Sequence, residues 1–140
     1  MYDKLLVGYD GSTEAHVALS HAISLAQIMG AEVWALWVRE IPCFAEVPSE
    51  ITAEEDAAES YLAKLTTEVT RLEREGAVEI HFYSQPGHAA EKIVRYAKEG
   101  AFDLVVLGSH GHSGLWGRLL GHTADRVREH APCSVLIVRS

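Results

Sequence analysis

Short apolar runs alternate with longer amphipathic stretches along most of this chain. The apolar runs are rich in aliphatic and aromatic residues, as buried strands are, and they cover residues 4–9, 31–38, 78–83, 102–107 and 134–139. In the stretches between them apolar residues recur every three or four positions, which predicts helices over 15–29, 52–76, 90–100 and 119–131. Ser12 can cap the start of the first of these helices, and Gly30 can end it. Strand and helix therefore alternate from one end of the sequence to the other.

This alternation predicts an α/β fold with a parallel sheet. Because each crossover helix must pack against one face of the sheet or the other, we expect helices on both faces. The expectation is a single domain over residues 1–140, with an open, twisted, five-stranded, Rossmann-like sheet in strand order 3-2-1-4-5.

Residues 39–51 break the pattern. This segment contains Pro42 and Pro48 and shows no clear period, so it is interpreted as a long connecting loop. A loop of this length either covers a pocket or is simply a mobile connection. The helix that follows is expected to begin at a capping box, Thr52-Ala53-Glu54-Glu55.

The composition of the chain argues against some classes of binding partner. The chain has 20 acidic and 12 basic residues and a formal net charge of −8. This balance argues against a surface for nucleic acid or anionic membrane, but one anion held by backbone amides remains compatible with it. We see no signal-type leader and no membrane-length apolar run, and Cys43 and Cys133 form no metal or disulfide pattern. We therefore expect a cytoplasmic protein.

The densest candidate chemistry follows the fourth apolar run. Gly108-Ser109-His110-Gly111 is followed, after nine residues, by Gly121-His122-Thr123. Glycines at a strand-to-helix junction let backbone N–H groups approach a phosphate, and the helix N-terminus adds its positive dipole. Asp10 closes the first strand and Val38 ends the second, and ligands of such sheets lie beyond the carboxyl ends of the strands. An acid on one wall and a glycine cradle on the other predict a nucleotide pocket.

The glycine loop is not one of the two common phosphate-binding motifs. It lacks the Gly-Lys-Ser/Thr ending of a Walker loop, and no GxGxxG follows the first strand. Instead the chain resembles the universal stress protein family, whose nucleotide-binding members carry G-x2-G-x9-G-[S/T] after the fourth strand. The resemblance spans the chain, because the blocks 7–12, 87–93 and 131–138 also match the family.

The resemblance implies a site for ATP, with any Mg²⁺ or Mn²⁺ carried on the phosphates. It places Asp10 at the adenine and ribose end and Val38 against the base. The main-chain N–H groups of Gly108, Gly111 and Gly121 would hold the ribose and the phosphates.

One position departs from the family pattern. The residue after the third glycine is His122 in place of Ser or Thr. The backbone N–H of His122 and its ring, when protonated, are the donors that remain there. Thr123 stands one residue late, and Ser109 is a further hydroxyl candidate.

Each candidate also has a purely structural explanation. Asp10 could only shape a turn, Val38 could belong to the core, and the glycines could serve turns. The loop histidines fit no standard zinc spacing, so we assign no metal ligands.

Three functions stay open at this point: a regulatory stress-response module that binds ATP, a very slow ATP hydrolase, and a structural, partner-binding dimer without nucleotide. We expect no catalytic residues, because no lysine is placed to bridge the outer phosphates. The last apolar run, Val135–Val138, would leave an open sheet edge. It therefore predicts a homodimer paired through this strand, as the resemblance also implies.

Overall fold

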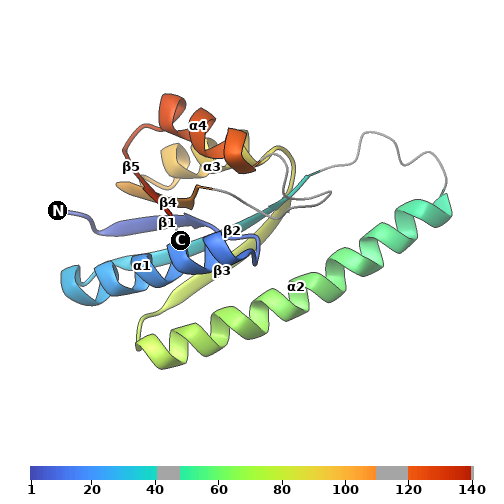
Figure 1. The fold of residues 1–140 in the computed structure, drawn as a ribbon, viewed down its shortest axis with the longest axis horizontal. Helices are drawn as coiled ribbons and strands as arrows, with labels where there is room; N and C mark the ends of the chain where they lie inside the picture. The colour runs from blue at the N-terminus through green and yellow to red at the C-terminus, as the bar shows by residue number, and fades with distance from the viewer. Residues whose placement is uncertain (41–47, 110–119, 140) are drawn as a thin grey trace.

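The computed structural model describes residues 1–40, 48–109 and 120–139, without the side chains of 48–54 and 120–122. Its five strands are all parallel and stand in the order β3-β2-β1-β4-β5, which confirms the predicted fold and strand order (Figure 1). The strands are β1 Lys4–Gly8, β2 Glu32–Arg39, β3 Ile80–Pro86, β4 Leu104–Gly108 and β5 Ser134–Val138. The helices are α1 Thr13–Met29, α2 Pro48–Gly76, α3 Ala89–Glu99 and α4 Leu120–His130.

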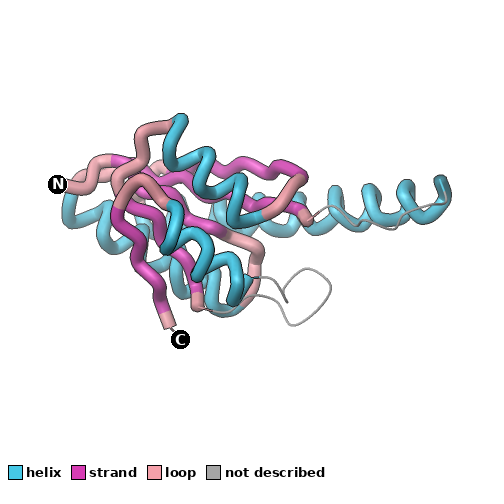
Figure 2. The backbone as a smooth tube through the Cα atoms, turned by 90° about the horizontal axis from the view of Figure 1, so that it is seen from above, coloured by secondary structure: helices cyan, strands magenta, loops and turns pink. Residues whose placement is uncertain are grey.

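Helices cover both faces of the sheet, and the side-chain alternation of the strands divides the core between them. Figures 1 and 2 show α1 and α2 on one face and α3 and α4 on the other. In β1, Leu5 and Val7 point into the α1–α2 layer, whereas Leu6 points into the α3–α4 layer. β1 and β4 lie in the interior of the sheet and are buried on both faces, which explains why their sequences are almost continuously apolar.

α1 begins and ends where the sequence predicts. The Ser12 hydroxyl oxygen accepts a hydrogen bond from the Ala15 N–H at 3.1 Å, as an N-cap residue does. Gly30 ends the helix in the left-handed conformation, with φ of 65°.

Two boundaries differ from the prediction by three residues or more. α2 begins at Pro48, so the expected capping box at 52–55 lies inside the helix, and the expected loop over 39–51 is shorter. Proline suits a first helical turn, whose N–H groups have no partner within the helix. β3 runs to Pro86 instead of ending near Tyr83. It is an edge strand with β2 as its only neighbour, so a proline at its end removes no hydrogen bond within the sheet.

No helix in the described ranges is both long enough and apolar enough to cross a bilayer.

Candidate functional site

The carboxyl ends of β1, β2 and β4 meet at one edge of the sheet. β1 is the central strand, with β2 on one side and β4 on the other, so the strand order reverses beside it. The Tyr9 N–H donates to the Leu36 carbonyl at 2.9 Å and extends the pairing of β1 with β2. α1, α3 and α4 all begin at this edge, because each follows a strand that ends there. A reversal point lined by helix N-termini is where ligands of such sheets bind.

Asp10 supplies an unusual acid at this edge. The residue is 6% exposed, and its Oδ1 accepts a hydrogen bond from the Ser12 N–H at 2.9 Å. Its Oδ2 is also buried but has no hydrogen-bond partner among the residues that the structure describes. A buried acceptor without a donor is costly, and a ligand that donates a hydrogen bond would satisfy it. The turn explanation of Asp10 therefore accounts for one carboxylate oxygen and leaves the other unused.

Tyr61, on α2, holds the backbone at Asp10. Its hydroxyl donates a hydrogen bond to the Asp10 carbonyl oxygen. The next residue, Gly11, has φ of 80°, and a Cβ built on it would lie 2.5 Å from the Tyr61 hydroxyl oxygen. The turn after β1 therefore needs glycine for its backbone conformation and for the close approach of α2.

The two phenols near Asp10 are held in their protonated form. Burial, followed by the negative charge of Asp10, raises the pKa of Tyr61 to about 12. Burial raises the pKa of Tyr9 to about 12 as well, with a further contribution from Glu68. At neutral pH the Tyr61 hydroxyl is therefore a hydrogen-bond donor to the Asp10 carbonyl.

Val38 lies level with Asp10 on the neighbouring strand. The β1–β2 register ends with Gly8 paired to Leu36, and Val38 follows Leu36 by two residues, as Asp10 follows Gly8. Val38 is partly buried and packs against the core of the α3–α4 layer. Its position is compatible with both sequence interpretations, a core residue and an apolar wall of the pocket.

Gly108 ends β4 on the other side of β1, where β4 approaches the first turn of α1. A Cβ built on Gly108 would lie 2.8 Å from Glu14 Cβ and 2.9 Å from its backbone carbon. The Ser109 N–H donates to the Val138 carbonyl at 2.9 Å, so this amide is engaged with β5. The Ser109 hydroxyl lies 3.5 Å from Glu14 Oε2. The Ser109 N–H is therefore not available to a ligand.

The remaining predicted residues belong to the loop and to the start of α4. Thr123 is 3% exposed and lies in the first turn of α4, together with Gly121 and His122. The N–H groups of a first helical turn have no carbonyl partner within the helix. Gly111, His110 and His112 lie outside the described residues, and so does the side chain of His122.

Glu40 closes the site on the side of α3. His88 occupies the N-cap position of α3 but makes no capping hydrogen bond with its side chain. Glu40 instead accepts a hydrogen bond from the Ala89 N–H at 3.0 Å, and its other oxygen lies 3.3 Å from His88 Nδ1. The carboxylate after β2 thus caps a helix that begins almost fifty residues later, a partnership that local sequence patterns do not show.

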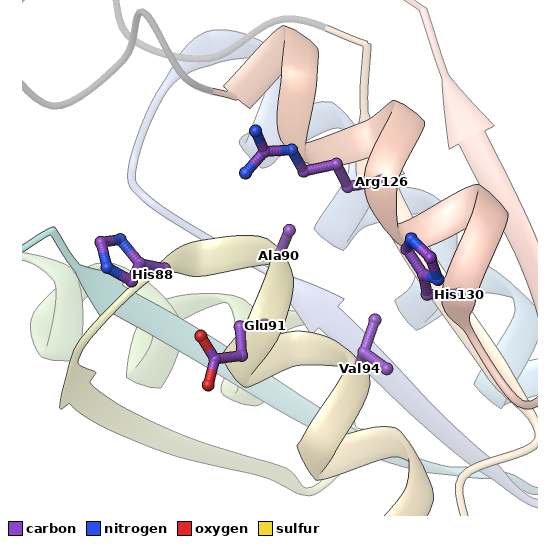
Figure 3. A pocket seen from close by; sticks show the side chains of 6 residues that line it. All are labelled: His88, Ala90, Glu91, Val94, Arg126 and His130. Carbon is purple, nitrogen blue, oxygen red and sulfur yellow. The ribbon is translucent and has the colours of Figure 1, made fainter.

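Two hollows are found among the described residues. The first, which we call the α3–α4 groove, has a volume of about 430 Å³, and Figure 3 shows Arg126 and His130 of α4 facing Ala90 and Val94 of α3. Its other lining residues are His88 and Glu91. The second, the amino-end hollow, has a volume of about 860 Å³ and lies where α1 and α2 end, beside Glu32 and Glu79. The buried unpartnered polar atoms found among the described residues line neither hollow.

The residues described contain no cluster of His, Cys, Asp and Glu suited to a metal ion.

Comparison with known proteins decides the family. Residues 1–139 match the model of the Universal stress protein family. The chain belongs to the universal stress protein family. Among curated members, a universal stress protein of Methanocaldococcus jannaschii is 33% identical, over 99% of this chain and 83% of its own length. Universal stress protein YxiE of Bacillus subtilis is also 33% identical, over 99% of this chain and 100% of its own length.

Solved structures of universal stress proteins share the fold. UspA of Lactobacillus plantarum superposes with a TM-score of 0.85 and 26% identity, over 99% of this chain and 98% of that one. A universal stress protein in complex with cAMP gives a TM-score of 0.74 at 24% identity, over 98% and 97% of the two chains. A family member from Arabidopsis thaliana with AMP bound gives 0.70 at 17% identity, over 98% and 91%.

Sequence reasoning missed Tyr61 and Glu40 in this universal stress protein domain. Tyr61 stood among the apolar positions of an amphipathic helix, where an aromatic residue ordinarily means packing. Glu40 stood in a segment without a period, so no pattern indicated its partner. In each case the contact joins residues about fifty positions apart, which is why neither is visible in local sequence.

Proposed function

We propose that this protein binds an adenine nucleotide, ATP in particular, at the carboxyl end of its sheet, and that it acts as a regulatory module in a stress response. The observation that carries the proposal is the buried, unpartnered Oδ2 of Asp10. Ribose hydroxyls and the exocyclic amine of adenine are neutral donors that satisfy such an acceptor. Family members with cAMP and with AMP bound support an adenine nucleotide as the ligand class.

The charges of the site orient the nucleotide in this proposal. The Asp10 carboxylate repels phosphates, so the nucleoside end lies at β1, with the base beside the aliphatic side chain of Val38. The phosphates then lie at the start of α4, where Gly121, His122 and Thr123 contribute first-turn N–H groups and the helix dipole is positive. Gly108, Ser109 and Gly111 complete the proposed set between these two ends.

Any Mg²⁺ or Mn²⁺ would be held by the phosphates and water in this arrangement. No metal-ligand cluster occurs among the described residues, and a divalent cation on nucleotide phosphates needs few protein ligands. We expect binding without efficient turnover, because the loop has no Walker lysine to stabilise charge on a transferring phosphoryl group.

Calorimetry with ATP, ADP, AMP and cAMP tests the proposal. We expect a Kd in the micromolar to millimolar range for ATP, as suits a sensor of cellular nucleotide, and a rise in Tm with ligand. Asp10→Asn keeps an oxygen for the Ser12 N–H and removes the charge, so it should weaken binding about tenfold or more.

Glu79→Gln is the matched control for that variant. It makes the same change of charge on a side chain that is 80% exposed at the other end of the sheet, and binding should not change. The proposal fails if the wild-type protein gives neither binding heat nor a shift in Tm with any of the four nucleotides. A dimer that shows neither response would support the nucleotide-free function instead.

We also propose that the protein forms a homodimer through β5. Among the described residues this strand has β4 as its only neighbour, and Val135, Leu136 and Ile137 are only partly buried in the single chain. An apolar edge strand with unpaired backbone groups favours pairing with a second copy. Sedimentation equilibrium at micromolar concentration should give about twice the chain mass of 15.4 kDa, whereas a stable monomer would contradict the dimer.

A further inference from the structure

α2 is the longest element of the molecule, and the proposed site does not use it as a whole. It has 29 residues, and Figure 1 shows its amino-terminal end, which we call the projecting end, extending beyond the sheet. Further along, Leu65 and Val69 anchor it in the core of the α1–α2 layer. Tyr61 lies between the projecting end and this anchor.

Tyr61 joins α2 to two strands of the site. Its hydroxyl donates to the Asp10 carbonyl, and its ring packs edge-on against Trp37 of β2 with 5.0 Å between the ring centroids. Gly11 lies directly against the same phenol, since a Cβ there would come within 2.5 Å of both the Tyr61 hydroxyl oxygen and Leu65 Cδ2. The turn after β1 and this part of α2 are therefore packed as one unit.

The orientation of the Asp10 carboxylate depends on this unit. The Asp10 carbonyl is fixed by Tyr61, and Oδ1 is fixed by the Ser12 N–H at 2.9 Å. With both held, the unpartnered Oδ2 points in one direction and its burial is maintained at 6% exposure of the residue. A shift of α2 away from β1 would release the carbonyl and let the whole turn move.

We propose that Tyr61 is a positioning residue that couples occupancy of the nucleotide site at Asp10 to the docking of α2. This inference rests on the proposed nucleotide function. A ligand held by Asp10 binds best when the Tyr61–Asp10 hydrogen bond is formed, so by linkage the ligand stabilises that bond and the docked position of α2. Occupancy of the site thereby changes how firmly α2 is docked, and with it the position of the projecting end of α2.

Tyr61→Phe tests the coupling with the smallest possible change. It keeps the ring against Trp37 and removes the hydroxyl that reaches Asp10. Tyr83→Phe is the matched control, because this tyrosine is 46% exposed on the edge strand β3. The two readouts are the Kd for ATP by calorimetry and the hydrogen–deuterium exchange of residues 55–75, with and without ATP.

In the wild-type protein ATP should slow exchange in α2 around Tyr61. In Tyr61→Phe the Kd should rise about three- to tenfold, as expected for one lost hydrogen bond, and the slowing by ATP should disappear. Tyr83→Phe should match the wild type in both readouts. Because the exchange difference compares the same variant with and without ligand, a general loss of stability does not imitate this result.

Two results would overturn the inference, and they differ. If Tyr61→Phe binds ATP with the wild-type Kd and shows the same ligand-dependent slowing in α2, Tyr61 is structural only and the proposed function stands. If the wild-type protein binds no nucleotide at all, the proposed function and the coupling both fall.

Discussion

The two ends of this sheet differ in charge and in hydrogen bonding. The amino-end hollow has a volume of about 860 Å³, but it is lined by Glu32 and Glu79 and faces the ends of α1 and α2, where the helix dipoles are negative. The carboxyl end carries the N-termini of α1, α3 and α4. All three side-chain atoms found buried without a hydrogen-bond partner in the described residues, on Asp10, Arg39 and Ser84, lie toward this end of their strands. Unused hydrogen-bonding capacity and the sign of the dipoles therefore identify the candidate site better than volume does.

Gly30 and Gly108 also differ between the two ends of the sheet. Gly30, at the amino end, has φ of 65° but would meet nothing within 4 Å if it carried a Cβ. Gly108, at the carboxyl end, is needed for space, because β4 approaches the backbone of Glu14 there. Gly30 caps the end of α1, whereas Gly108 lets β4 approach the first turn of α1.

The largest expected effect comes from filling the space at Gly108. Gly108→Val should lower the free energy of unfolding by about 3 kcal/mol, because the side chain collides with the first turn of α1. Asparagine tolerates the left-handed conformation, so Gly30→Asn should lower the free energy of unfolding by less than about 1 kcal/mol. Urea unfolding measures both, and equal losses would show that the close approach at Gly108 is not limiting.

A smaller effect is expected from the N-cap of α1. Ser12→Ala removes the acceptor for the Ala15 N–H and should cost about 1 kcal/mol of stability. Ser12→Asp restores an acceptor at the same position and should recover most of the loss in the same unfolding experiment. A variant with alanine that unfolds like the wild type would mean that this helix start needs no cap.

Two variants of Glu40 separate what its charge and its hydrogen bond each contribute to the capping of α3. Glu40→Gln keeps an oxygen for the Ala89 N–H and should cost only a few tenths of a kcal/mol, through the lost interaction with the helix dipole. Glu40→Ala removes the acceptor too and should cost about 1 kcal/mol. If the two variants are equally stable, the observed hydrogen bond contributes nothing and the end of β2 is not tied to α3 in this way.

The last expected effect is a pH dependence at the carboxyl end, which appears only at high pH. The pKa of Tyr9 and of Tyr61 is raised to about 12 in the folded protein, against an ordinary value of 10.0. The folded state thus holds more protons than the unfolded state between these values, so stability present below pH 10 falls as the pH rises toward 12. An absorbance titration of phenolate should show two tyrosines that ionise near pH 12 in the wild type and one in Tyr61→Phe. The absence of any late-ionising tyrosine would contradict the burial of this cluster.

Most of the fold follows from the pattern of the sequence, but boundaries and partners do not. The apolar runs give the five strands, and Ser12 and Gly30 mark α1 correctly, because caps and periodicity are local signals. The predicted start of α2, at Thr52, is four residues too late, because the helix already begins at Pro48. Inside that helix the capping-box pattern at Thr52 has no capping function. The extension of β3 to Pro86 depends on its being an edge strand, which is a property of the assembled sheet.

The sequence predicts that the candidate residues lie at one edge of the sheet, but it does not predict their hydrogen-bond partners. The carboxyl ends carrying Asp10, Val38 and Gly108 do meet, as the order of the elements requires. Whether an Asp10 oxygen stays unpartnered, and whether the Ser109 N–H is taken by Val138, depends on contacts between distant segments. Such contacts have no signature in a single sequence, so they had to come from the structure.

The central claim, that an adenine nucleotide binds at the carboxyl end of the sheet, is tested most directly by mapping ATP onto the backbone amides with heteronuclear NMR. Titration with ATP should shift the amide signals of Asp10, Ser12, Val38, Ser109 and Thr123 and leave those of Gly30, Glu32 and Gly76 at the amino end unchanged. Shifts confined to the amino end, or no shifts at millimolar ATP, would contradict the account.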